Sequence, residues 1–139
     1  MITRALLKHG VSAEQLLVIE SSVSMSRNLK HLFPTVKVLQ ADAARLGMLL
    51  KVSGFSNPTT VVSSLPLISL YSRQRFRILK EIASVLPVGG HLIQFTYSPL
   101  PPISVVLAKR LGFEGTRVRR IAINLPPAAV WVYEKKFSR

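Results

Sequence analysis

The stretch from Leu16 to Glu20 reads LLVIE, four apolar residues in a row followed by an acid. A continuous apolar run of this length is typical of a strand that is buried on both faces of a parallel sheet. The residues after it place Met25, Leu29 and Leu32 at helical spacing, and the serines before Met25 can cap a helix. A buried strand followed by an amphipathic helix predicts a βα unit.

The same alternation of apolar runs and helical periodicity continues toward the C-terminus. Pro34, the loop 53–58 and the pair Gly89-Gly90 interrupt it where one element should end. The segment 72–86 has the clearest helical pattern, because its apolar residues share one face and its basic residues gather on the other. The elements predicted in this way are strands over 16–19, 36–40, 59–62 and 91–97 and helices over 25–33, 43–51, 72–86 and 104–111.

The last two apolar runs, 117–125 and 128–134, are separated by Pro126 and Pro127. A short break between two strand-like runs suggests an antiparallel pair. Together with the repeated βα units, this pair predicts an α/β fold with a mostly parallel sheet and a C-terminal antiparallel strand pair. For a chain of 139 residues we expect a single domain, 1–139.

The composition excludes several kinds of chemistry. The chain has no cysteine, so disulfides, thiolate zinc sites and a cysteine nucleophile are excluded. Its three histidines are scattered without a carboxylate cluster, so we expect no metal site. No apolar run reaches the roughly 18 to 20 residues that cross a bilayer, and the N-terminal residues lack the pattern of a signal peptide. We therefore expect an intracellular protein.

The charge is strongly one-sided. Nineteen Lys and Arg against six Asp and Glu give a net charge of +13. A field of this sign attracts polyanions such as nucleic acid or an anionic membrane surface, and the charge alone does not choose between them. The alternative is an ordinary solvated surface that keeps an apolar protein soluble.

Three phrases of the sequence carry a resemblance: VVSSLPL (61–67), LPVGGHLIQFTYSP (86–99) and LPPAAVWVY (125–133). In this order they resemble the bacterial phospholipid N-methyltransferases, a group of class I S-adenosylmethionine-dependent methyltransferases, and the resemblance runs from Ile2 to Tyr133. It implies a Rossmann-like sheet with S-adenosylmethionine as the cofactor. It also implies a phospholipid substrate, methylated on the amine headgroup of a phosphatidylethanolamine-type lipid.

The resemblance places the cofactor beyond the carboxyl ends of the strands, where ligands bind in doubly wound sheets. Glu20 with the adjacent Ser21 is expected to hold the ribose hydroxyls, and Asp42 with Ala43 the adenine amino group. Ser63 completes the predicted cofactor contacts. Each acid also has a structural interpretation, Glu20 as a surface acid at a strand end and Asp42 as a helix N-cap that remains compatible with cofactor binding.

The turn after Ser63 is where the resemblance places the methyl acceptor. In related amine methyltransferases a polar-x-Pro-x turn offers a side-chain oxygen and a backbone carbonyl to the target amine, so Ser64 and Pro66 are predicted catalytic residues. A hydroxyl is a weak base, so we expect catalysis mainly by proximity. Tyr97 is predicted to line the headgroup pocket. The alternatives are a strand-end serine before a proline turn for Ser64 and a core aromatic for Tyr97.

One feature expected from the resemblance has no counterpart in the sequence. The helix that matches ITRALLKHG (2–10) should follow a first strand and a glycine-rich loop that approaches the methionine end of the cofactor. We therefore expect a sheet without its usual first strand, a gap through which the chain could oligomerise. A longer native protein and a truncated, inactive remnant are the open alternatives, and the assignment as an enzyme rests on the resemblance.

The substrate class is a separate question. The sequence also resembles the ribosomal RNA adenine dimethylases, which use a basic surface as well. In those enzymes an aromatic residue ends the turn, whereas this sequence has Leu67 at that position. A lipid substrate instead predicts a cytoplasmic protein bound peripherally to the anionic inner face of the membrane. The basic residues expected at the membrane are Arg73, Arg77, Lys109, Arg110, Arg119 and Arg120. The apolar residues expected either to insert there or to belong to the core are Leu100, Ile103, Val106 and Leu107.

Overall fold

The structure, a computed structural model, describes residues 2–121 and 128–138. The chain divides into two compact units, Met1–Arg45 and Leu46–Arg139, which we call unit 1 and unit 2. Each unit has its own sheet. That the two units form a single domain stays a prediction.

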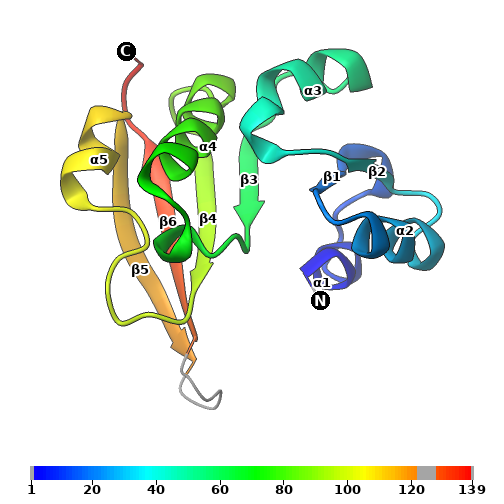
Figure 1. The fold of residues 1–139 in the computed structure, drawn as a ribbon, viewed down its shortest axis with the longest axis horizontal. Coiled ribbons are helices and arrows are strands. Elements are labelled where there is room, and N and C mark those ends of the chain that lie inside the picture. Colours follow the sequence, from blue (N-terminus) through cyan, green and yellow to red (C-terminus); the bar gives the residue numbers. More distant parts are fainter. Residues whose placement is uncertain (1, 122–127, 139) are drawn as a thin grey trace. The chain divides into compact units, whose positions relative to one another are not determined.

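Unit 1 contains a two-stranded parallel sheet (Figure 1). Strand β1 pairs with β2, with Leu17 opposite Lys37 and Glu20 opposite Gln40. Strand β1 lies one residue further along than predicted, so it includes Glu20. The elements of unit 1 are α1 (Ile2–Lys8), η1 (Ala13–Gln15), β1 (Leu17–Glu20), α2 (Val23–Leu32), β2 (Lys37–Gln40) and η2 (Ala43–Arg45).

Helix α2 is capped as its sequence predicts. The Oγ of Ser22 accepts a hydrogen bond from the Met25 N–H at 3.3 Å. Leu29 is buried in the core of unit 1, whereas Met25 and Leu32 are 57% and 40% exposed. A sheet of two strands is only about 10 Å wide, so within unit 1 it covers part of the predicted apolar stripe.

Unit 2 contains a four-stranded sheet in the order β3-β4-β6-β5. Strand β3 is parallel to β4, and β6 is antiparallel to both β4 and β5. The predicted C-terminal antiparallel pair is therefore confirmed, although residues 122–127 lie outside the described part. The elements of unit 2 are α3 (Leu46–Ser53), β3 (Thr60–Ser63), η3 (Leu67–Ser69), α4 (Ser72–Val85), β4 (His91–Thr96), α5 (Val105–Arg110), β5 (Phe113–Ile121) and β6 (Ala128–Lys135).

The predicted fold class is confirmed. Strands β1 and β2, which are joined by α2, pair in parallel, and so do β3 and β4, which are joined by α4. The antiparallel pair, β5 and β6, comes last in the chain. Among the described residues β1 pairs only with β2, and on its other side β3 has no partner. The structure therefore has the mostly parallel α/β arrangement expected of a sheet that lacks its usual first strand.

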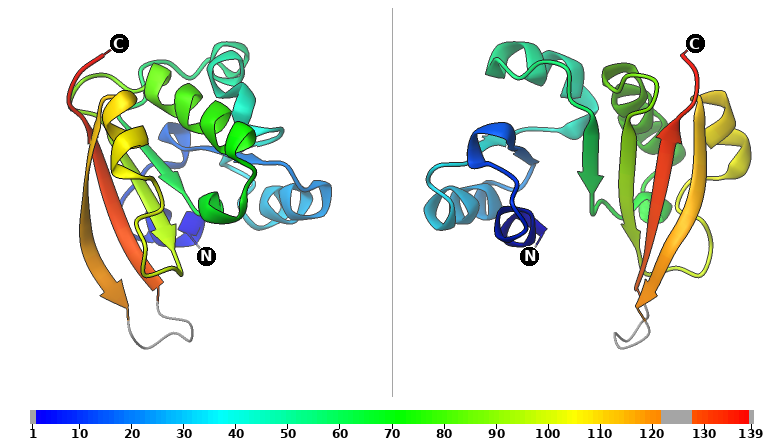
Figure 2. Two further views of the ribbon diagram at one scale, coloured as in Figure 1. Left: turned by 60° about the vertical axis from the view of Figure 1, so that its left-hand side comes forward. Right: turned by 180° about the vertical axis from the view of Figure 1, so that it is seen from behind.

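The core of unit 2 lies between its sheet and two helices. Seen from behind in Figure 2, the four strands lie in front of α4 and α5, so both helices cover the same face. Leu79 of α4 and Leu92 of β4 are fully buried, and Tyr133 of β6 is 2% exposed. Gly115 lies opposite Tyr133, and a Cβ at this glycine would collide with the tyrosine ring. This position therefore requires glycine for packing.

Two charged residues tie elements of unit 2 together. Glu81 of α4 accepts a hydrogen bond from the Gly47 N–H (3.1 Å) at the start of α3, which links the two helices. Lys135 is 5% exposed, and its Nζ donates to the carbonyls of Ala83 and Leu86 at the end of α4. Burial lowers the pKa of Lys135. A cation at a helix C-terminus stabilises the free carbonyls there.

Candidate functional site

The two predicted cofactor acids follow neighbouring strands of unit 1. Glu20 is the last residue of β1 and Asp42 comes two residues after the end of β2. Because β1 and β2 are parallel and in register, with Glu20 opposite Gln40, both acids lie at the same edge of this sheet. Parallel strands bind ligands beyond this edge. The structure therefore brings the two predicted cofactor residues to one end of unit 1.

Glu20 is held by the chain that follows it. One carboxylate oxygen, Oε1, accepts a hydrogen bond from the Ser22 N–H at 3.2 Å, and the side chain is half-buried. The neighbouring Ser21 is exposed, and its carbonyl accepts from the Gln40 side-chain amide at 2.9 Å. These bonds fix the loop after β1. The second carboxylate oxygen of Glu20 has no hydrogen-bond partner in the described structure.

Asp42 caps the turn after β2. Its Oδ1 accepts a hydrogen bond from the Ala44 N–H at 2.9 Å, which satisfies the first turn of η2. The side chain is exposed, and Ala43 beside it is half-buried. The N-cap interpretation is thus confirmed in a 3-10 turn that precedes α3, and it leaves Oδ2 facing solvent. Cofactor contacts by Ser21, Asp42 and Ala43 stay predictions.

The predicted acceptor turn follows β3 in unit 2. Ser63 is 6% exposed, and its Oγ accepts a hydrogen bond from the Leu65 N–H at 3.2 Å. Leu67 is 2% exposed and anchors the turn in the core. Ser64 and Pro66 lie on the exposed side. Ser63 therefore supports the turn in the structure, and its contact with the cofactor stays a prediction, whereas the Ser64 hydroxyl is accessible to a substrate.

The backbone carbonyl of this turn is already saturated. Leu65 O accepts one hydrogen bond from the Leu67 N–H at 2.8 Å and another from the Gln94 side-chain Nε2, also at 2.8 Å. A carbonyl oxygen has two lone pairs, so neither is left for a substrate amine. That this turn offers a side-chain oxygen and a backbone carbonyl to an amine stays a prediction, in which the Ser64 hydroxyl is exposed and the Leu65 carbonyl is occupied.

Gln94 is a residue that sequence reasoning misses. It lies in β4 directly opposite Ser63, and its side chain is fully buried. Nε2 also donates to Phe95 O at 3.0 Å, while Oε1 has no hydrogen-bond partner in the described structure. The available signal is a single amide inside the apolar strand HLIQFTY (91–97). Such an amide is costly to bury unless its groups are paired.

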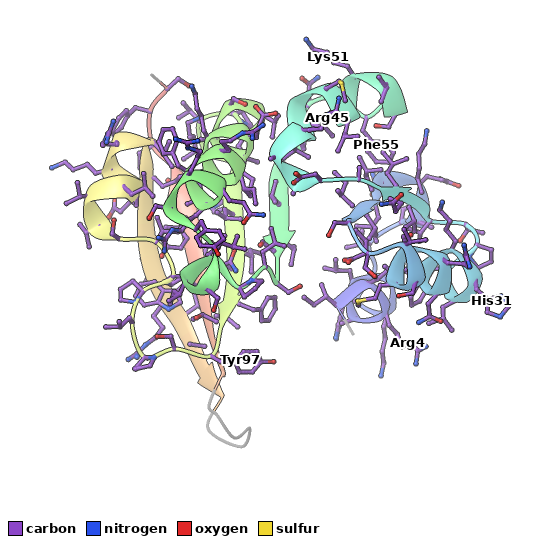
Figure 3. The ribbon with its side chains drawn as sticks, in the orientation of Figure 1. Arg4, His31, Arg45, Lys51, Phe55 and Tyr97 are labelled. Carbon is purple, nitrogen blue, oxygen red and sulfur yellow. The ribbon has the colours of Figure 1, made fainter. Side chains whose placement is uncertain are left out.

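Tyr97 follows β4 and is not a core aromatic. Its side chain is 64% exposed and projects away from the strands at the end of β4 (Figure 3). The core alternative is therefore wrong, because β4 ends at Thr96 and the exposed Tyr97 lies beyond the strand. The predicted role of Tyr97 in a headgroup pocket stays a prediction.

Unit 2 has a cavity of about 340 Å³ beside the starts of α4 and α5. Arg75 supplies its cationic group and donates from Nη2 to the Ser72 Oγ at 3.4 Å. None of the predicted acceptor residues lines this cavity. The residues that line it are Ser72, Arg75, Phe76, Pro102, Ser104 and Leu107.

Exposed apolar side chains gather in the chain segment that borders this cavity. Leu100, Val105 and Val106 are 65%, 76% and 73% exposed, whereas Ile103 is 1% exposed. The prediction of membrane insertion is therefore wrong for Ile103, which belongs to the core, and Leu107 is half-buried. The basic residues that are exposed in unit 2 include Arg73, Arg77, Lys109 and Arg110, while the side chains of Arg119 and Arg120 lie outside the described part.

The described residues contain neither a metal-binding cluster nor a helix that could cross a membrane. No group of three His, Asp or Glu there is arranged to hold a metal ion. None of the described helices is long and apolar enough to span a membrane. His31, one of the three histidines, points away from α2 (Figure 3).

Comparison with known proteins yields structural similarity alone. No family model matches the sequence, and no curated protein matches it. A Burkholderia thailandensis 1,6-didemethyltoxoflavin N1-methyltransferase, solved with its substrate and S-adenosylhomocysteine, matches with a TM-score of 0.68 and 11% identity, over 97% of this chain and 66% of its own. An rRNA methylase from Streptococcus thermophilus matches with a TM-score of 0.57 and 17% identity, over 87% of this chain and 73% of its own.

A third similar structure is the Thermus thermophilus 16S rRNA N2 G1207 methyltransferase in complex with AdoMet and guanosine. Its TM-score is 0.57 at 18% identity, over 88% of this chain and 29% of its own. Identities this low carry the fold and nothing finer. The chain has the Rossmann-like fold of the S-adenosylmethionine-dependent methyltransferases.

Proposed function

We propose that this chain is an S-adenosylmethionine-dependent N-methyltransferase whose acceptor is the amine headgroup of a phosphatidylethanolamine-type phospholipid. The observation that carries the proposal is the pair of acids, Glu20 and Asp42, at one edge of a parallel sheet in a methyltransferase fold. A nucleoside presents two ribose hydroxyls and an adenine amino group. These groups are hydrogen-bond donors, and carboxylates at such an edge can accept their hydrogen bonds.

The residues present fit the nucleoside part of this cofactor. Glu20 keeps Oε2 for the ribose hydroxyls while Oε1 is held by the Ser22 N–H, so the carboxylate is oriented before the ligand arrives. Asp42 would accept from the adenine amino group through its second carboxylate oxygen while Oδ1 continues to cap η2. Charge-assisted hydrogen bonds of this kind are worth roughly 1.5–3 kcal/mol each.

The chemistry that S-adenosylmethionine supplies when bound is an electrophilic methyl group, which passes from sulfur to the lone pair of an amine nitrogen. Ser64 Oγ accepts an N–H of that amine and so directs its lone pair. The proton that the methylated nitrogen must lose would pass to water, because a serine hydroxyl is too weak a base to take it. Most of the catalytic effect in this scheme comes from positioning.

A lipid acceptor is supported by the surface of unit 2. Leu100, Val105 and Val106 are exposed next to the cavity that contains Arg75. Exposed apolar side chains beside a cation suit the interface of an anionic bilayer. The apolar side chains would contact the acyl chains, and the cation would contact the lipid phosphates. In this proposal the protein is cytoplasmic and binds peripherally to the inner face of the membrane.

RNA is the second candidate substrate. Two of the similar proteins are rRNA methyltransferases, and the net charge of +13 suits a polyanion. Tyr97, which is 64% exposed, follows the strand next to the acceptor turn and has a π-face that a base can stack on. With an RNA substrate, the exposed Tyr97 would contact a base; with a lipid substrate, the exposed Leu100, Val105 and Val106 would contact the bilayer.

The first experiment measures cofactor binding by calorimetric titration of S-adenosylmethionine. Glu20→Gln and Asp42→Asn are each expected to weaken binding tenfold or more, because each removes a charged acceptor. Glu14→Gln is the matched control. Glu14 is an exposed acid of unit 1 that precedes β1 and is not at the carboxyl end of a strand. No binding by the wild-type chain would overturn the proposal that this chain is an enzyme.

The second experiment follows transfer of a labelled methyl group into phosphatidylethanolamine vesicles and into ribosomal RNA. Label in lipid supports the proposal, and label in RNA alone reverses the order of the two candidates. Ser64→Ala is expected to reduce transfer while leaving cofactor affinity unchanged, because Ser64 touches the acceptor in this scheme. Equal loss of cofactor binding in Ser64→Ala would contradict that role.

The membrane surface is tested by sedimentation with anionic and neutral vesicles. The double substitution Val105→Asp and Val106→Asp should weaken binding to anionic vesicles about tenfold or more, since each valine loses apolar burial and gains a repelled charge. Val88→Asp is the control, because Val88 is 59% exposed and is not in that segment. Equal effects of the two changes would show that only net charge matters.

A further inference from the structure

We infer that Gln94 is the positioning residue of the acceptor turn and that, by occupying the Leu65 carbonyl, it leaves the Ser64 hydroxyl as the side-chain acceptor that the turn presents to an amine. The inference rests on the proposed function, because it assigns the amine to this turn. It is carried by contacts within unit 2. Gln94 is opposite Ser63 in the sheet, fully buried, and bonded to a carbonyl that lies 29 residues earlier in the chain.

The amide of Gln94 can face only one way. Both acceptors of Nε2 are backbone carbonyls, Leu65 O at 2.8 Å and Phe95 O at 3.0 Å. Rotating the amide would place Oε1 against those oxygens, and neither carbonyl could donate to it. The observed orientation leaves Oε1 without a hydrogen-bond partner in the described structure. Gln94 therefore serves this position through its two donors.

The peptide groups of Leu65 are held from both sides. Ser63 Oγ accepts from the Leu65 N–H at 3.2 Å, and the Leu65 carbonyl accepts from Gln94 and from the Leu67 N–H. The turn is thus fixed by side chains of the adjoining strands, Ser63 of β3 and Gln94 of β4, as well as by its own Leu67 N–H. A substrate amine that approaches the exposed side meets the Ser64 hydroxyl and finds the carbonyl occupied.

An apolar side chain would serve equally well if Gln94 only filled space. Leu92, two residues earlier in β4, is also fully buried and fills its space with carbon alone. Burying an amide whose oxygen has no donor is unfavourable, and it is offset here by the bonds of Nε2 to the Leu65 carbonyl of the turn and to the Phe95 carbonyl of β4. The polar choice at position 94 is explained by what it holds.

The test compares Gln94→Met with Leu92→Met, which places the same side chain in the same strand without touching the turn. In Gln94→Met both donors to Leu65 and Phe95 are lost. The Leu65 and Leu67 amide protons should exchange with solvent about tenfold faster in native-state hydrogen exchange, because the turn opens more often. Exchange equal to that of wild type in Gln94→Met would overturn the inference, whatever the protein's activity.

The catalytic readout separates this inference from the proposed function. In an active protein, Gln94→Met should raise the KM for the amine substrate about tenfold, with the Kd for S-adenosylmethionine unchanged. A change in both constants would mark a general loss of structure and would contradict a positioning role. Inactivity of the wild-type chain would instead defeat the proposed function, and the exchange experiment would still decide about Gln94.

A second variant covers the case in which Gln94→Met does not fold. Ser63→Ala removes the Ser63 Oγ, at the end of β3, that accepts from the Leu65 N–H, and it keeps the Gln94 contacts. It should accelerate exchange of the Leu65 amide while the Leu67 amide, still bonded to the Leu65 carbonyl, remains protected. Loss of protection at neither amide would show that the turn is held by other means, against the inference.

Discussion

Unit 1 and unit 2 hold their candidate residues in opposite ways. In unit 1, Glu20 and Asp42 each accept one backbone N–H from the residues that follow them, and each keeps a carboxylate oxygen available. In unit 2, the Leu65 peptide groups are saturated by Ser63 and Gln94, and both of these side chains are buried. The acids are fixed by local bonds alone, whereas the turn has a local bond to Ser63 and, in addition, a bond from Gln94 on the neighbouring strand. Changes at the acids should therefore affect binding alone, and changes beneath the turn should also affect stability.

The cores of the two units show the same contrast and give the largest expected effect. Leu92→Ala in unit 2 should lower the free energy of unfolding by about 2–5 kcal/mol, because Leu92 is fully buried between sheet and helices. Val38→Ala in unit 1 removes two methyl groups from a smaller cluster and should cost roughly 1–2 kcal/mol. Trp131 is the single tryptophan, so its fluorescence follows unit 2 during denaturant unfolding.

Unit 1 has neither Trp nor Tyr between residues 1 and 45, so hydrogen exchange of the β1 and β2 amides follows it instead. Val88→Ala is the control for unit 2, since Val88 is exposed and its loss should change stability little. A larger loss for Val38→Ala than for Leu92→Ala would contradict the contrast between the two cores.

Alkaline pH should lower the stability of unit 2 through Tyr133, which has no counterpart in unit 1. Burial raises the pKa of Tyr133 from 10.0 to about 12, and contact with the Ile103 backbone offsets this only in part. Between these values the unfolded chain releases the phenol proton while the folded state keeps it, so the stability of unit 2 is present below pH 10 and falls as the pH rises toward 12. The expected loss is about 2 kcal/mol, from roughly 1.4 kcal/mol per pH unit.

Tyr133→Phe removes this dependence while keeping the ring that packs against Phe113 and Trp131. The difference between the two proteins in unfolding free energy, measured by Trp131 fluorescence from neutral pH to pH 12, isolates the phenol from the lysines that titrate nearby. Identical pH profiles would mean that Tyr133 ionises in the folded state. The β1 and β2 amides of unit 1 should show no difference between the two proteins.

The order of elements was predictable because it depends on local signals. LLVIE, the breaks at Pro34 and Gly89-Gly90, and the basic face of 72–86 each act over a few residues, and the strands and helices lie within a few residues of their predicted ends. The N-cap of Ser22 was visible for the same reason. These features require no knowledge of distant parts of the chain.

The support of the candidate site was not predictable, because it depends on distant contacts. Gln94 reaches Leu65 across 29 residues, and Glu81 reaches Gly47 across 34. A single amide in the strand 91–97 does not show whether Gln94 faces solvent or the core. Its contact with Leu65 depends on the pairing of β4 with β3. The exposure of Tyr97 is likewise decided by where the sheet ends rather than by its neighbours in sequence.

The smallest effect compares two N-caps, one in each unit. Ser22 Oγ accepts from the Met25 N–H at 3.3 Å, and Ser104 Oγ accepts from the Leu107 N–H at 3.2 Å. Ser22→Ala and Ser104→Ala should each cost about 1 kcal/mol, because the lost bond is the same in both helices. Exchange of the Met25 and Leu107 amides measures each effect, and Ser→Thr at either position should restore most of the protection.

Helix α5 has six residues, too short to be stable in isolation, whereas α2 has ten. Helix α5 persists because its neighbours are fixed on both sides: Ile103 is buried before it, and Gly112 after it accepts the Lys136 N–H at 2.7 Å. If these anchors hold α5, Ser104→Ala loosens only its first turn. A loss well above that of Ser22→Ala would mean that the cap itself holds α5 in place, and unit 2 would then depend on a local contact as unit 1 does.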